Sequence, residues 1–200
     1  MPDVLGRVEA VKAFPVKSLQ AAPLPAIELD DAGVVGDRRW AVVADEGVVT
    51  ADAAPRLRDV VAAAGPDGAP LVTVPAGAPG VRGDAADAAL TGLLGRRVRL
   101  APVAAGSTLD APVHLVSRQA LDAAARGEHD AADCACSLEE PRANLVLDLA
   151  GLREEQLVGR RLTVGTAVLR VVRRPDHCLG VYAEVERPGR IGTGDEVRDA

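Results

Sequence analysis

Two cationic positions near the N-terminus have the types and surroundings of an anion site. Lys17 lies in a turn that follows Pro15, and Arg38 with Arg39 follows the pair Gly36-Asp37. Side chains in loops and at strand starts can point into the mouth of a site rather than into a core. A lysine and an arginine that converge on one spot can hold a phosphate, since the guanidinium offers a planar fork of donors. The alternative is solvated surface charge, paired locally with the Asp37 carboxylate.

A second pair, Arg142 and Asn144, stands just before an apolar run. Alternation along an extended chain places both side chains on the same face. That face would present a guanidinium and an amide to a polar ligand. The alternative is a cap between loop and strand, in which Asn144 bonds to backbone.

Cys178 is the third candidate, because a thiol is a soft metal ligand and, when deprotonated, a nucleophile. Arg173, Arg174 and His177 are near enough in the sequence to lower the pKa of this thiol. The alternative is a buried structural cysteine at the start of a strand.

The remaining cysteines and histidines are weaker candidates. Cys134 and Cys136 form a C-x-C pair near His129, but no second pair lies at the spacing of a zinc site. His114 lies in an apolar segment, where a packing role is the more common one. The sequence also contains neither a P-loop nor a G-x-S-x-G motif.

Composition excludes several classes of protein. The 200 residues carry a net charge of −6, which argues against a nucleic-acid-binding surface. No apolar run is long enough to span a membrane, and the N-terminus lacks a signal-peptide core. Three cysteines cannot complete a disulfide framework, which favours a reducing compartment. We therefore expect a cytoplasmic protein with neither nucleic-acid nor membrane partners.

Short apolar segments separated by glycine and aspartate turns predict a mainly β fold with a few short helices. Gly165 is expected to form the turn of a hairpin within residues 160–174. Asp84 and Ser117 are expected to cap two of the helices, and Gly95 to end the first of these. The predicted helices are 54–64, 85–94 and 118–126, and the main predicted strands are 4–13, 26–29, 39–44, 71–74, 96–102, 111–117, 143–149 and 178–185.

These segments, in this order, resemble the MOSC superfamily, named for the C-terminal domain of molybdenum-cofactor sulfurases. FPVKSL, GVVGDRRWAVV and VVTADAAPRL resemble its N-terminal β-barrel module. APVHLVS, PRANLVLD, EEQLVGRRLTVGTAVLRVV and GVYAEVERPGRIGTGDEV resemble the MOSC domain itself. The resemblance implies a small β-barrel-like module in residues 1–105 packed on a MOSC-type β-barrel in residues 106–200, contracted after Cys178.

The same resemblance implies a role around molybdenum cofactor, that is, molybdopterin. Some members, such as the mitochondrial amidoxime-reducing component, bind it and reduce N-hydroxylated compounds, and pyridoxal phosphate binding is associated with the family as a whole. Carried over by position, Lys17 and Arg38, assisted by Ser18, would hold the pterin phosphate. Arg142 and Asn144 would bind pterin polar groups, and Cys178 would ligate molybdenum.

Departures from the family pattern keep alternatives open. Only Leu179 separates Cys178 from the GVYAEV segment, where family members usually have a few tens of residues. Cys178 therefore matches either the ligand cysteine or a second cysteine that some bacterial relatives carry just before this segment. Asp52 and Asp176 add carboxylates that would repel an anionic cofactor.

The leading hypothesis is an oxidoreductase that reduces N-hydroxylated or related substrates. It would need an electron-donor protein, because the sequence has no flavin or iron–sulfur signature. The alternatives are a sulfur carrier, loaded as a Cys178 persulfide by a cysteine desulfurase, and a non-catalytic binding module that has lost the cofactor site.

Overall fold

The computed structural model describes residues 3–103, 111–128, 141–176 and 178–200. The chain forms two compact units that alternate along the sequence. Unit 1 comprises Met1–Lys12, Pro23–Val35 and Leu109–Ala200, and unit 2 comprises Ala13–Ala22 and Gly36–Thr108. The predicted boundary between residues 105 and 106 falls outside the described residues and stays a prediction.

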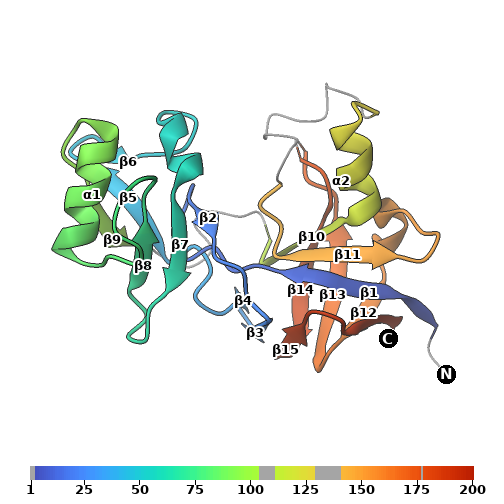
Figure 1. Ribbon diagram of the computed structural model, residues 1–200. Coiled ribbons are helices and arrows are strands. Elements are labelled where there is room, and N and C mark those ends of the chain that lie inside the picture. Colours follow the sequence, from blue (N-terminus) through green and yellow to red (C-terminus); the bar gives the residue numbers. More distant parts are fainter. Residues whose placement is uncertain (1–2, 104–110, 129–140, 177) are drawn as a thin grey trace. The chain divides into compact units, whose positions relative to one another are not determined.

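A closed barrel of seven strands forms the centre of unit 1 (Figure 1). Its interior is filled by aliphatic side chains, because the chain has only one residue of each aromatic type. Leu115, Leu145, Leu147, Leu162 and Leu169 are all less than 2% exposed. In order around the barrel, the strands are β1 (Val4–Val11), β11 (Leu145–Leu149), β10 (Val113–Ser117), β14 (Val181–Arg187), β13 (Ala167–Arg173), β12 (Arg161–Val164) and β16 (Glu196–Asp199).

Strands β10 and β11 are parallel, so the chain must cross over between them. Helix α2 (Arg118–Ala125) lies in this connection and packs against both strands. The Ser117 hydroxyl accepts a 3.1 Å hydrogen bond from the Ala120 amide, which confirms the predicted cap. The hairpin of β12 and β13 turns at Gly165, whose φ is +56°. Outside the barrel, unit 1 has a sheet in the order β15 (Gly189–Gly192), β3 (Ala26–Asp30), β4 (Gly33–Val34), and a short 3₁₀ helix, η3 (Glu154–Leu157).

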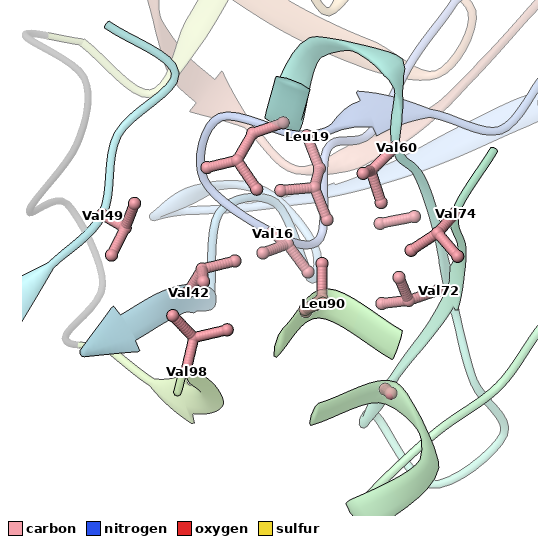
Figure 2. Packing of buried hydrophobic residues seen from close by; sticks show 12 residues of the cluster. Val16, Leu19, Val42, Val49, Val60, Val72, Val74, Leu90 and Val98 are labelled. Carbon is pink, nitrogen blue, oxygen red and sulfur yellow. The ribbon is translucent and has the colours of Figure 1, made fainter. Parts of the chain in front are cut away.

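Unit 2 has its own core, built almost entirely from valine, leucine and alanine (Figure 2). Val16 and Leu19, on either side of the predicted phosphate turn, are both fully buried in it. One sheet has the order β2 (Gln20–Ala21), β7 (Val61–Ala64), β8 (Pro70–Thr73), and the other β6 (Gly47–Val48), β5 (Trp40–Ala44), β9 (Arg99–Pro102); helix α1 (Asp84–Leu94) and the 3₁₀ helix η1 (Pro55–Asp59) complete the unit.

The predicted mainly β fold with a few short helices is confirmed, but several local expectations were wrong. Residues 54–64 form η1 followed by β7 rather than one helix, because Ala62 is fully buried where β7 lies between β2 and β8. Helix α1 begins after Gly83 rather than being capped by Asp84, and it ends as predicted at Gly95, whose φ is +68°. Among the described residues, no helix is long and apolar enough to cross a membrane.

Candidate functional site

The predicted phosphate residues in unit 2 begin with a tight turn at Lys17 and Ser18. The Leu19 amide donates to the Val16 carbonyl at 3.3 Å and closes this turn. Since Val16 and Leu19 are buried, the core of unit 2 holds both ends of the turn. Ser18 lies in the left-handed region with φ +70°, a conformation that costs a non-glycine residue about 1–2 kcal/mol.

Arg38 lies on a second turn that is bonded to the first segment. Its amide donates to the Phe14 carbonyl at 2.6 Å, and its φ is +50°. Its guanidinium lies 4.9 Å from the centre of the Phe14 ring, within the range of a cation–π contact. Asp37 forms an ion pair with Arg38 and also accepts a 2.6 Å hydrogen bond from the Phe14 amide. Both charged side chains are only 7% exposed, so this is a buried pair.

Further backbone bonds join the two segments. The Lys17 amide donates to the Trp40 carbonyl at 2.8 Å, and the Trp40 amide donates to the Pro15 carbonyl at 3.0 Å. The structure therefore brings Lys17, Ser18 and Arg38 onto two adjacent stretches of backbone. Apart from glycines, the described residues with positive φ are Ser18, Arg38 and Ala76. Two of these three are predicted site residues, and strained backbone concentrates at functional sites.

The positive charges of Arg38 and Lys17 differ in whether a neighbouring carboxylate offsets them. The Arg38 charge is offset by Asp37 at direct contact. Lys17 is partly exposed, and no hydrogen bond or ion pair of its ammonium group is found in the described part of the chain. Lys17 therefore supplies the uncompensated positive charge.

In unit 1, Arg142 and Asn144 differ in their surroundings. The Ala143 amide donates to the Pro141 carbonyl at 2.6 Å, which forms a tight turn around Arg142, and β11 begins only at Leu145. Alternation along a strand therefore does not relate the two side chains. Arg142 is partly exposed, whereas Asn144 is fully buried.

The Asn144 side chain bonds to two backbone groups. Its Oδ1 atom accepts from the His114 amide at 3.1 Å, and its Nδ2 atom donates to the Lys12 carbonyl at 3.2 Å. These bonds join β1, β10 and β11 at one place. They agree with the structural alternative for Asn144, and its assignment to the pterin stays a prediction.

Cys178 is partly exposed, precedes β14 by two residues, and is disulfide-bonded. Thiolate ligation of a metal therefore requires that this disulfide first be reduced. Cys134, Cys136, His129 and His177 lie outside the described residues. Within the described ranges, no group of three histidine, cysteine or carboxylate side chains could hold a metal ion.

Two residues beside Cys178 were missed as functional candidates. The His114 Nε2 atom lies 2.7 Å from the Leu179 carbonyl, so this nitrogen carries the proton and donates. The Glu154 carboxylate is 5% exposed; its Oε1 atom accepts from the Gly180 amide at 2.7 Å, and its Oε2 atom accepts from the Ser117 amide. Burial raises the pKa of Glu154, and these hydrogen bonds oppose the shift only in part.

An arginine and two rings extend this cluster. The rings of His114 and Tyr182 meet edge to face with centres 5.0 Å apart. The Arg173 guanidinium lies 5.1 Å from the centre of the Tyr182 ring. Arg173 is one of the cations that the sequence suggested for lowering the pKa of Cys178. Its contact with Tyr182 holds it in this cluster.

A surface pocket of about 1070 Å³ lies elsewhere in unit 2, between β5, α1 and β9. Asp45, Asp84, Asp87, Arg97 and Arg99 line it, and none of the predicted site residues does. The predicted residues form two groups, Lys17, Ser18 and Arg38 in unit 2, and Arg142, Asn144 and Cys178 in unit 1.

The fold and these groups define a mainly β protein with a closed barrel, a cationic turn pair and a polar cluster around a cysteine. Residues 5–97 match the family model described as the MOSC N-terminal beta barrel domain, which confirms the resemblance for this part of the chain. The structure aligns with the crystal structure of the YuaD protein from Bacillus subtilis at 16% identity and a TM-score of 0.48, over 96% of this chain and 93% of that chain. No curated protein sequence gives a significant match.

Proposed function

We propose that this protein binds molybdenum cofactor and acts as an oxidoreductase on N-hydroxylated or related substrates. The observation that carries the proposal is the match of residues 5–97 to the MOSC N-terminal domain, because this span contains Lys17, Ser18 and Arg38. The strained, cross-bonded backbone at Ser18 and Arg38 supports a binding role for these turns.

The donors of the turn pair fit the phosphate end of a pterin cofactor. Phosphate binding needs net positive charge and several directed donors. Lys17 supplies the charge and Ser18 a hydroxyl, while the planar guanidinium of Arg38 is held in one orientation by Asp37 and Phe14. In this proposal Lys17 dominates the affinity and Arg38 the geometry.

When bound, the cofactor would supply a metal centre capable of two-electron transfer. Reduced Cys178 would offer a thiolate to that centre, and the partly exposed Arg142 would bind a polar edge of the pterin. Electrons would come from a partner protein.

One observation favours the sulfur carrier as the second candidate. Cys178 is partly exposed, so the sulfur of a partner protein can approach it once its disulfide is reduced. In a carrier, the Cys178 thiolate would attack the outer sulfur of a desulfurase persulfide, forming the Cys178 persulfide and releasing the desulfurase thiolate. A mass increase of one sulfur on Cys178 after incubation with a cysteine desulfurase would support this function.

The test of the leading proposal is molybdenum and pterin content after expression with cofactor supply and purification under reducing conditions. Lys17→Ala should lower the pterin content at least tenfold, whereas Arg97→Ala, an exposed cation elsewhere in unit 2, should leave it unchanged. Cys178→Ser should reduce molybdenum with less effect on pterin. Wild-type protein without pterin, or equal loss in both cation variants, would refute the proposal.

A further inference from the structure

The three residues Cys178, Leu179 and Gly180 are held more firmly than a short connector needs. They precede β14, which begins at Val181 and already pairs with β10 through backbone bonds. Yet buried polar side chains bond both polar atoms of the peptide group between Leu179 and Gly180.

Glu154 holds the amide of this peptide group. Its carboxylate joins the Gly180 amide, at the entry to β14, to the Ser117 amide, at the end of β10. Leaving a carboxylate at 5% exposure is costly, because burial disfavours its charge. A neutral side chain would fill the same space at lower cost if packing alone were needed.

His114 holds the carbonyl of the same peptide group. The Nε2–H group of its ring donates to the Leu179 carbonyl at 2.7 Å, and its backbone amide donates to Oδ1 of Asn144. Hydrogen bonds therefore hold both the ring and the backbone of His114. The edge contact with Tyr182 fixes the plane of the ring.

Gly180 completes the arrangement. Its φ is +99°, and a Cβ atom there would lie 2.2 Å from the Leu115 carbonyl oxygen and 2.7 Å from the His114 Nε2 atom. The backbone after Cys178 therefore passes directly against β10, at a distance that only glycine permits.

We propose that Glu154 and His114 are positioning residues that fix the backbone after Cys178 and so limit the approach to its sulfur. The inference deepens the proposed function, because it assigns supports to the residue on which both the molybdenum and the sulfur chemistry depend. Functional groups must be held by such supports to be effective.

The test is the rate at which iodoacetamide alkylates Cys178 in the reduced, full-length protein, followed peptide by peptide by mass spectrometry. His114→Leu and Glu154→Gln should each raise this rate at least fivefold. His114→Gln, which can place an N–H donor near the same carbonyl, should restore most of the wild-type rate. Exchange of the Gly180 amide with solvent should also accelerate in Glu154→Gln.

Leu162→Ala is the control for general destabilisation, because Leu162 is a fully buried barrel residue with no polar bond to this segment. An alkylation rate within twofold of wild type in both positioning variants would overturn the inference, as would equal acceleration in Leu162→Ala. The readout needs no cofactor: failure to find pterin would refute the proposed function alone, and unchanged alkylation would refute this inference alone.

Discussion

The Phe14 amide donates a 2.6 Å hydrogen bond to Oδ1 of Asp37, which lies 23 positions later in the chain. The other oxygen of the same carboxylate pairs with Arg38. One buried side chain thus joins the segment that leads to Lys17 with the turn that carries Arg38. The geometry of the candidate anion site depends on Asp37, although an aspartate cannot itself attract a phosphate.

Asp37→Ala should destabilise unit 2 by about 3–5 kcal/mol, because it removes the carboxylate that forms an ion pair with the buried Arg38 guanidinium. Asp52→Ala, which removes an exposed ion pair with Arg58, should cost less than about 1 kcal/mol. Urea unfolding followed by Trp40 fluorescence measures both, since Trp40 is the only tryptophan and lies in unit 2. Similar losses in the two variants would show that the Asp37 pair is not effectively buried.

Ser18→Gly should stabilise unit 2 by up to about 1 kcal/mol, because glycine adopts a φ of +70° without strain. Ser18→Ala keeps the strain and loses the hydroxyl, so it should give no gain. If the Ser18 hydroxyl serves phosphate binding, pterin content should fall in both variants because both lack this group. A loss of stability in Ser18→Gly would contradict the assignment of strain at this turn.

Gly180→Ala should destabilise the barrel by several kcal/mol. The new Cβ atom would overlap the Leu115 carbonyl oxygen, and the alanine would also have to adopt a positive φ. Gly194→Ala is a matched control: its φ is +91°, and its Cβ would meet nothing within 4 Å. It should cost only the backbone term of about 1–2 kcal/mol. Thermal unfolding of the two variants separates close approach from backbone strain, and equal losses would remove the evidence for close approach.

The stability difference between wild type and Glu154→Gln should depend on pH. Because burial raises the folded-state pKa of Glu154, its stabilising contribution is fully present below the unfolded value of about 4.5 and is lost as pH rises through the folded value. Glutamine does not titrate, so the advantage of wild type should shrink as the pH rises above about 4.5. Urea unfolding at several pH values checks this, and an advantage that grows with pH would contradict the raised pKa.

Local signals in the sequence were sufficient for several elements. Gly95, Ser117 and Gly165 act through their own backbone or their nearest neighbours, so a helix end, a cap and a turn could be predicted. The strand expected from Cys178 begins only at Val181, because bonds from Glu154 and His114 hold the preceding residues in another conformation.

Long-range polar bonds account for what sequence reasoning missed at the site. Glu154 reads as part of an acidic connector, and its partners are backbone amides 37 and 26 residues away. Backbone amides carry no residue-type signal, so no motif could have revealed them. His114 was assigned to packing, which its Tyr182 contact supports, but its bond to Leu179 was equally invisible.

The pairing of β1 with β16 constrains the order in which the two units can fold during synthesis. Val4 lies opposite Arg198, so the first and last strands of the barrel are neighbours only in the finished fold. Strand β1 leaves the ribosome long before β16 exists, and contacts of such high sequence separation form slowly. Unit 2, whose strands come from residues 20–102, can assemble during this interval. The barrel edge of β1 must meanwhile stay unpaired or be protected, which makes nascent chains the stage most exposed to aggregation.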